Sequence, residues 1–205
     1  MPESPEELYA RIVDQVGEAG RLPMSPVSSW DVFPWEVVDG ELVPKVVPPP
    51  LEVEVPRAGD PGGEPCGTCA GHGAETRIWE NDRWTLKPRP RSGLPLVLVL
   101  ETREHLDYPD LDDDLAAEYG RLSVRLCRIM SNLPHVGRVH VCRWGDGSEH
   151  LHLWFISRPE RLPNVLGSLS IEWDDMLPPT PEDTWRADLK AVADRLATHD
   201  GRALV

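Results

Sequence analysis

The feature that most constrains the fold of this chain is an alternating run at residues 150–156, with the sequence His-Leu-His-Leu-Trp-Phe-Ile. Alternation with period two is typical of a β-strand, and it places His150, His152 and Trp154 on one face of the strand. A glycine-rich turn, residues 145–148, precedes the run. A single strand histidine is often a hydrogen-bonded core residue, but packing explains two imidazoles on one face poorly. The run therefore predicts a strand with a candidate functional site.

A second cluster of reactive side chains lies upstream, where Cys66 and Cys69 are separated by Gly and Thr. Two cysteines at this spacing fit half of a zinc site, a redox pair or coincidence. A redox pair follows a strand and begins a helix, whereas Pro65 and the surrounding glycines favour a tight metal-binding turn. A structural zinc ion takes four nitrogen or sulfur ligands, so two more must come from elsewhere. We interpret Cys127 and Cys142 as buried thiols. The available histidines are His72, His105, His135, His140, His150, His152 and His199.

Together these features resemble the histidine triad (HIT) superfamily, in particular its zinc-containing branch, which is similar to galactose-1-phosphate uridylyltransferase. The family motif alternates histidines with apolar residues and has His or Gln at its third position. This chain has His150, His152 and Trp154 in that register. A register with His150 in the middle puts Glu149 at an apolar position and displaces Arg158, so we reject it.

The resemblance covers roughly residues 64–197 and implies a structural zinc site. The apolar strand at 96–100 and the histidine that follows it resemble the family segment before a long helix. In the zinc-containing branch, two cysteines, that histidine and the first triad histidine bind the metal. The implied ligands are Cys66, Cys69, His105 and His150. His72, three residues after the second cysteine, stays open as an alternative to the post-strand histidine.

The resemblance also implies that His152 is a catalytic nucleophile. Its imidazole would attack the α-phosphorus of a nucleoside phosphate derivative and form a nucleotidyl-histidine. Neutral imidazole suits this role near pH 7, and a carbonyl can hold its other nitrogen and fix the tautomer. Backbone N–H groups of Gly145 and Gly147 and the hydroxyl of Ser148 would bind phosphate oxygens. Arg158 and Arg143 are further candidates for phosphate binding, with a surface ion pair as the alternative role for each.

Trp154 departs from the family pattern at a position that also belongs to the substrate site. Relatives have there a histidine that protonates the leaving group or a glutamine that holds phosphate oxygens. An indole N–H can donate one hydrogen bond but has no titratable proton, and general-acid help contributes about 10²–10⁴ in rate. The substitution therefore favours substrates whose leaving group is already good, such as pyrophosphate or a sugar phosphate.

Three functional hypotheses stay open. The first is a nucleotidyl hydrolase or transferase that acts on a nucleotide or nucleotide-sugar type of small molecule through a nucleotidyl-histidine. The second is a zinc-stabilised nucleotide-binding protein without catalysis, and the third is a structural or interaction protein. Whether the chain is an enzyme is therefore uncertain from the sequence, as are the base, the sugar and the acceptor.

Composition narrows these alternatives. The chain has 205 residues with 40% hydrophobic content, which is enough for one sizeable core. A formal net charge of −14 argues against general nucleic-acid binding, and the small basic cluster of Lys87, Arg89 and Arg91 is interpreted as a solvated or ion-paired face. The longest apolar run is too short to span a membrane. The first residues lack a signal-peptide pattern, so we expect a cytoplasmic protein whose cysteines are thiols or metal ligands.

The pattern of elements predicts an α+β fold, a HIT-like antiparallel sheet with helices on one face. Helices are expected at 4–18, with Ser4 as N-cap, at 112–131 and at 185–197. Strands are expected at 76–79, 84–86, 94–100, 139–143 and 150–156. Residues 64–205 form the HIT-like domain in this division. Residues 1–63 are an N-terminal helix and a proline-rich arm that packs on the core or on the second subunit of a homodimer, with little regular structure.

Overall fold

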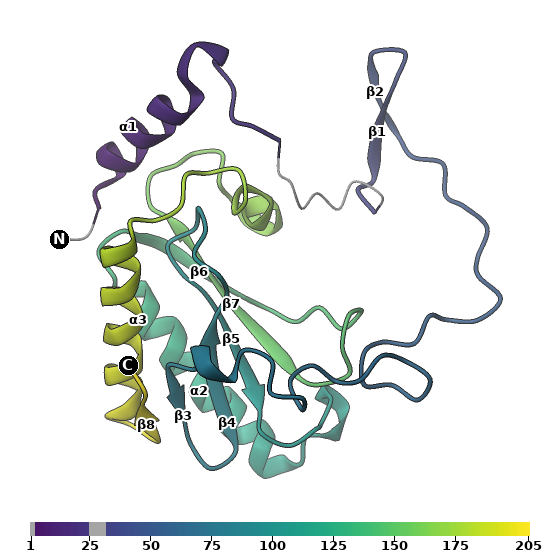
Figure 1. The fold of residues 1–205 in the computed structure, drawn as a ribbon, viewed down its shortest axis with the longest axis vertical. Coiled ribbons are helices and arrows are strands. Elements are labelled where there is room, and N and C mark those ends of the chain that lie inside the picture. The colour runs from purple at the N-terminus through teal and green to yellow at the C-terminus, as the bar shows by residue number, and fades with distance from the viewer. Residues whose placement is uncertain (1–2, 25–31) are drawn as a thin grey trace.

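The computed structural model describes residues 3–24 and 32–205, which contain one six-stranded antiparallel sheet. The strand order is β6-β7-β5-β4-β3-β8, so neighbours in the sheet are not all neighbours in the sequence (Figure 1). The strands are β3 (Trp79–Glu80), β4 (Trp84–Pro88), β5 (Val97–Thr102), β6 (Val136–Cys142), β7 (His152–Pro159) and β8 (Arg202–Ala203).

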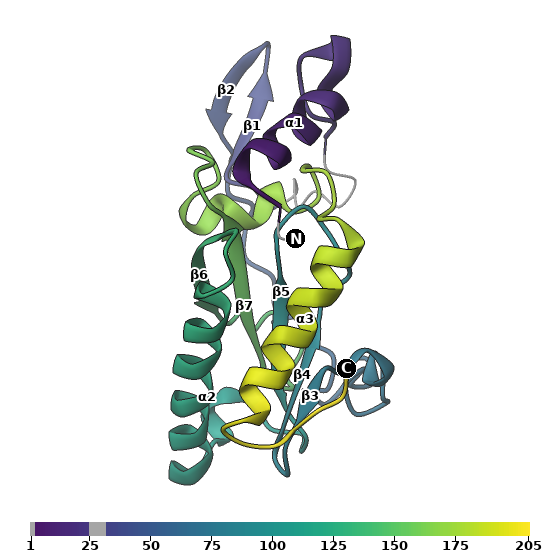
Figure 2. The same cartoon turned by 90° about the vertical axis from the view of Figure 1, so that its left-hand side faces the viewer.

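Two helices cover one face of this sheet, α2 (Asp113–Ser131) and α3 (Glu182–Ala197) (Figure 2). The Asp112 carboxylate caps α2 by accepting the Leu115 N–H at 2.7 Å, and the acidic first turn suits the positive end of the helix dipole. The predicted α+β class, with an antiparallel sheet and helices on one face, is confirmed. No helix in the described parts of the chain is long and apolar enough to cross a membrane.

Strand β7 shows the alternation that the sequence predicted. Leu151, Leu153 and Phe155 are fully buried against the helices, while His152 and Trp154 are half-buried on the opposite face. The regular strand begins at His152, two residues later than predicted. The reason is that the preceding Leu151 N–H donates to the carbonyl of Leu106, in the loop after β5, rather than to β5 itself.

The opposite face of the sheet is partly covered, and the sequence analysis had assigned no element to that face. Helix α1 (Pro5–Val16) and the 3₁₀ segment Gly167–Trp173 pack there against a second apolar cluster. Ser4 and Glu7 form the capping box that starts α1, so the predicted N-cap is confirmed. The second cluster is built on Leu94, Val97, Ile156, Val165 and Leu177.

The proline-rich arm contains a hairpin that the sequence analysis missed, β1 (Trp35–Val38) and β2 (Glu41–Pro44). The turn is Asp39-Gly40, with φ of 51° and 84°. Asp-Gly is a preferred residue pair for a two-residue hairpin turn. The prolines do not prevent the hairpin, because Pro34 and Pro44 lie at its ends. Figure 1 shows the hairpin standing clear of the sheet. The arm's Trp30 lies outside the described residues.

Other element boundaries moved for local reasons. Strand β5 starts at Val97 rather than at residue 94, because Pro95 has no N–H to donate to a neighbouring strand. Helix α3 starts three residues earlier than predicted, directly after Pro181. The two-residue strand β8 is new, and it closes the sheet edge by pairing with β3.

Candidate functional site

The two cysteines lie in a knuckle of consecutive tight turns. The Ala70 N–H donates to the Cys66 carbonyl at 3.0 Å, and the His72 N–H donates to the Gly67 carbonyl at 2.9 Å. The Cys69 N–H in turn points at the Cys66 Sγ, 3.4 Å away. This local folding brings the two sulfur atoms within 4.8 Å of each other, in the tight turn that the proline and glycines of the segment predicted.

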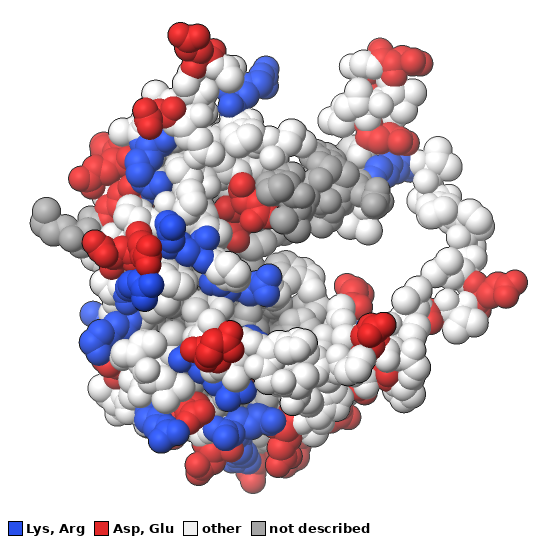
Figure 3. Space-filling model, in the orientation of Figure 1, with Lys and Arg blue, Asp and Glu red and all other residues white. Residues whose placement is uncertain are grey.

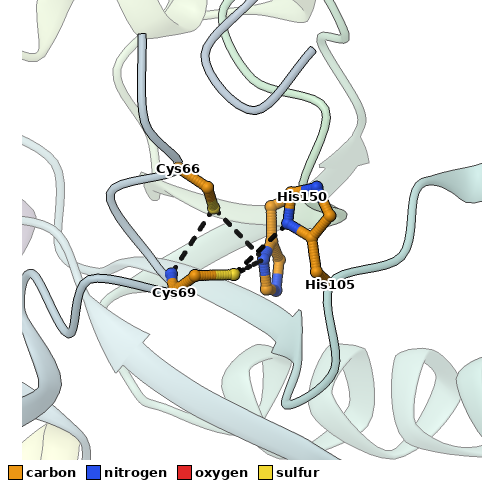
Figure 4. A group of neighbouring side chains, drawn as sticks. All are labelled: Cys66, Cys69, His105 and His150. Atoms are coloured by element: carbon orange, nitrogen blue, oxygen red, sulfur yellow. Dashed lines mark hydrogen bonds between the residues drawn. The ribbon is translucent and has the colours of Figure 1, made fainter. Parts of the chain in front are cut away.

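Two histidines from distant loops meet the knuckle (Figure 4). The ligand atoms of Cys66, Cys69, His105 and His150 all lie within 4.8 Å of one another. The Nδ1 of His105 is 3.3 Å from the Cys69 Sγ, and the Nδ1 of His150 is 3.5 Å from both sulfur atoms. His72, the alternative ligand, is not a member of this group in the described residues.

Each histidine has its other ring nitrogen occupied by an acceptor. The Nε2 of His150 lies 2.8 Å from the carbonyl oxygen of Thr102, and the Nε2 of His105 lies 3.1 Å from the Glu149 carboxylate. An N–H donated to these oxygens leaves the Nδ1 lone pair directed at the sulfur atoms, as in the outer hydrogen bonds of metal-binding histidines. The donor set of two sulfurs and two imidazole nitrogens fits zinc.

The surroundings tie this cluster to the sheet. Thr68, inside the knuckle, donates to the Glu101 carboxylate of β5 at 3.2 Å, and Lys87 of β4 pairs with the same carboxylate at 2.9 Å. Burial lowers the pKa of His150, which favours its neutral, ligand form. Gly59, at φ +100°, lies so close to His105 that an added Cβ would be 2.9 Å from the ring. The segment before the knuckle therefore helps to hold His105.

His152 stands next to this cluster with a defined tautomer. Its Nδ1 lies 2.7 Å from the carbonyl oxygen of His150, so the ring donates its proton there. The Nε2 lone pair then remains available for a nucleophilic attack. His150 thus has two roles in the geometry, since its ring joins the cysteines and its backbone oxygen orients the neighbouring imidazole.

The glycine-rich loop beside His152 is anchored by the end of the arm. Gly147 and Glu149 exchange backbone hydrogen bonds with Ala58, at 3.2 and 2.9 Å. Arg57 donates to the Gly145 carbonyl at 3.1 Å and to the Asp107 carboxylate at 2.8 Å. The carbonyl oxygens of Gly145 and Gly147 accept two of these bonds, and the Glu149 N–H donates a third to the Ala58 carbonyl. Among bonds between described residues, the N–H groups of residues 145–148, Ser148 included, donate to no backbone oxygen.

The sequence analysis missed this anchor. Arg57 and Asp107 form the centre of an ion-pair network in which Arg143 also donates to the same carboxylate. Arg143, considered as a phosphate partner from the sequence, is thereby occupied. The signal that could have found the anchor is the turn sequence from residue 57 to 63, Arg-Ala-Gly-Asp-Pro-Gly-Gly, in which Asp60 binds the Arg57 side chain.

The other two predicted substrate residues, Trp154 and Arg158, lie at different distances from His152. The Trp154 ring lies 6.5 Å from the His152 ring, on the same face of the sheet. Arg158 is six residues further along β7 than His152, which corresponds to roughly 20 Å of strand. Its guanidinium donates to the carbonyl of Pro159. The structure therefore does not bring Arg158 to the site.

No protein-family model and no curated protein matches this chain. Among solved structures, similar chains include three histidine triad proteins. A hypothetical histidine triad nucleotide-binding protein from Sulfolobus tokodaii has 14% identity and a TM-score of 0.47, covering 65% of this chain and 93% of that one. A Zn-bound histidine triad family protein from Mycobacterium smegmatis has 18% identity and a TM-score of 0.46, covering 65% and 95%.

The third is a histidine triad protein from Marinobacter aquaeolei VT8, with 20% identity and a TM-score of 0.48, covering 62% of this chain and 93% of that chain. All three matches leave about a third of this chain uncovered. The chemistry proposed below therefore depends on this chain's own residues.

Proposed function

We propose that this protein is a nucleotidyl hydrolase or transferase in which His152 forms a covalent nucleotidyl-histidine. The observation that supports this most is the hydrogen bond from His152 Nδ1 to the His150 carbonyl, 2.7 Å long. It makes the Nε2 of a half-buried imidazole the free, basic nitrogen. A histidine that served only to pack in a buried strand would not need its ring held in one tautomer.

The first step is an attack of His152 Nε2 on the α-phosphorus of a nucleoside phosphate derivative. The P–N bond forms while the bond from phosphorus to the leaving oxygen breaks, and the electron pair stays on that oxygen. Among the described residues, the N–H groups of residues 145–148 donate to no backbone oxygen, so they can donate hydrogen bonds to the charged phosphate oxygens. Water or a phosphorylated acceptor then attacks the adduct and releases His152.

Zinc is proposed as a structural ion held by Cys66, Cys69, His105 and His150. Four protein ligands fill a tetrahedral coordination sphere, so when bound the ion supplies cross-linking rather than an open site for water. The proposal rests on the spacing of the four ligand atoms and on the occupied outer nitrogens of both histidines. In this role the knuckle, the loop after β5 and the residues just before β7 are fixed together, and His152 is positioned indirectly.

Intact-mass spectrometry tests the proposed reaction. The purified protein is incubated with a panel of nucleoside diphosphates, nucleoside triphosphates and nucleotide sugars, and quenched early. A mass increase of one nucleoside monophosphate, or turnover of one panel member, is the expected result. Tight binding with neither adduct nor turnover would favour a zinc-stabilised nucleotide-binding protein without catalysis, for which the missing proton donor at Trp154 is the main argument. Absence of binding would leave the structural or interaction hypothesis.

Substitution of Trp154 by histidine tests the interpretation of the leaving group. A histidine at this position restores a titratable proton beside His152, so hydrolysis of substrates with a poor leaving group, such as a nucleoside phosphoramidate, should rise by up to about 10²-fold. Steady-state kinetics with Trp154→His, compared with the sterically similar but non-titrating Trp154→Phe, measure this. An equal rise in both variants would show that the indole merely blocks the site.

A homodimer is proposed as the state in which the arm is covered. In the single chain, a series of arm side chains is exposed although they are apolar, which is unusual for a monomeric surface. Light scattering of the full chain should therefore give twice the mass of one chain, and replacing Val46 and Val47 with serine should weaken the association. The exposed arm residues are Val37, Leu42, Val46, Val47, Leu51, Val53 and Val55.

A further inference from the structure

An arginine and two tryptophans stand together beside His152. The Cζ of Arg89 lies 5.3 Å from the centre of the Trp154 ring, within the range of a cation–π contact. Trp144, from the loop after β6, meets the same indole edge to face, with ring centres 5.5 Å apart. The Trp154 ring also has the His152 ring as a neighbour, with ring centres 6.5 Å apart.

The backbone explains why Arg89 reaches this position. Lys87 pairs with Val99, and Val99 pairs with Trp154, so these three side chains share one face of the sheet. Arg89 follows Lys87 by two residues, and its N–H donates to the Val97 carbonyl at 2.8 Å, which continues the ladder. Side chains two apart on a strand point to the same side. Arg89 therefore belongs to the face of the sheet that carries His152.

Arg89 differs from the basic residues around it in having no hydrogen-bond or ion-pair partner among the described residues, although its charge acts on the nearby Asp174 carboxylate. Lys87 pairs with Glu101, and Arg91 donates to the carbonyl of Thr180. The guanidinium of Arg89 makes no ion pair and no hydrogen bond within the parts of the chain that the structure describes, and the residue is exposed. The nearby Asp174 carboxylate accepts instead from Ser92 and from the Leu94 N–H.

The indole under Arg89 has an unused donor as well. The Nε1 of Trp154 is buried and has no hydrogen-bond partner among the described residues. A buried donor without a partner is uncommon in folded proteins and calls for an explanation. In Figure 3 the Lys and Arg side chains lie mainly on the body of the molecule, whereas the side chains of the arm are mostly uncharged, with some Asp and Glu among them. An anion bound beside the indole would meet a guanidinium that makes no ion pair and no hydrogen bond among the described residues.

We propose that Arg89 and Trp154 form a subsite for the anionic phosphate portion of the leaving group, which narrows the substrates to nucleotides that release phosphate, pyrophosphate or a sugar phosphate. This inference rests on the proposed function of His152. As the P–N bond to His152 forms, the P–O bond breaks and the departing oxygen keeps the electron pair. Arg89 neutralises that charge without giving up a proton, because a guanidinium stays protonated in proteins. No protonation of the leaving group is then needed, and Trp154 is compatible with turnover.

Two measurements test this subsite, each with the full chain. Binding of inorganic pyrophosphate is followed by calorimetry for the wild type, Arg89→Ala and Arg89→Lys, with Arg91→Ala as the matched control of equal charge. Loss of a charge-assisted hydrogen bond should weaken binding about 10- to 100-fold in Arg89→Ala. Arg89→Lys should retain part of the affinity, and Arg91→Ala should bind as the wild type does. Pyrophosphate binding that is undetectable in the wild type, or equal in wild type and Arg89→Ala, overturns the proposal.

The kinetic measurement compares two leaving groups on the same nucleoside. A nucleoside triphosphate releases pyrophosphate. A nucleoside 5′-p-nitrophenyl phosphate instead releases p-nitrophenolate, which has a single negative charge and no phosphate group. For Arg89→Ala, kcat/KM should fall about 10- to 100-fold with the triphosphate and by much less with the p-nitrophenyl ester. Equal losses on both substrates overturn the assignment to the leaving group. If the wild type turns over neither, the role of His152 has failed, and the pyrophosphate titration decides separately whether the anion subsite exists.

Discussion

Replacing His152 by alanine is expected to abolish the nucleotidyl adduct and to reduce turnover by on the order of 10⁴-fold or more, as loss of a covalent nucleophile does elsewhere. The zinc content and the thermal stability should stay close to those of the wild type. Within the described residues, the His152 ring makes one hydrogen bond, to the His150 carbonyl, and it is half-buried rather than part of the main core. Removing the His152 ring therefore removes few of the contacts that stabilise the fold.

The matched control is His140→Ala. His140 lies on the same face of the sheet, in β6, opposite Ile156. Its replacement by alanine therefore removes an imidazole from this face while the proposed nucleophile stays in place. Adduct formation by intact mass, zinc by atomic emission and melting by calorimetry are measured on all three proteins. If His152→Ala loses its zinc, the register of the triad is displaced by two residues and the assignment of the nucleophile fails with it. If His152→Ala still forms the adduct, another side chain is the nucleophile.

The parts of the fold predicted from the sequence are those with a strong local signal. The α2 helix was predicted from residue 112 because an acidic first turn precedes a regular apolar stripe, and in the structure Asp112 is its N-cap. The alternation in β7 gave the correct buried set because burial on one face leaves only one allowed register. The β1–β2 hairpin was missed because prolines were counted and the Asp39-Gly40 turn between them was not.

The candidate site shows the same division. The four side chains of the cysteine and histidine cluster could be named from the sequence because the resemblance fixes their spacing, and the structure brings their ligand atoms together. Arg89 and Arg57 could not be assigned, since their contacts depend on long-range pairing. Arg89 reaches Trp154 only because β4, β5 and β7 are neighbours, and Arg57 reaches the loop at Gly145 across 88 residues of sequence. A linear pattern holds no information about such contacts.

Loss of a zinc ligand is expected to have the largest effect on stability. The ions of structural sites contribute folding free energy directly, because the unfolded chain does not preform the site. The four proposed ligands join three separate segments, the knuckle, the loop after β5 and the residues just before β7. His150→Ala should therefore reduce zinc from one ion per chain to well below one, and should lower the melting temperature by about 10 °C, as a loss of roughly 4 kcal/mol would in a chain of this length.

His150→Ala should also remove the adduct, because the displaced backbone no longer orients His152 through its carbonyl. Cys66→Ser should give the same loss of zinc, since a hydroxyl is a poor substitute for a thiolate at this metal. His105→Ala tests the fourth ligand, with His72→Ala as the control for a knuckle histidine outside the cluster. We expect zinc to be lost with the first and retained with the second. The opposite outcome would make His72 the fourth ligand, and full retention of zinc in His150→Ala would refute the site.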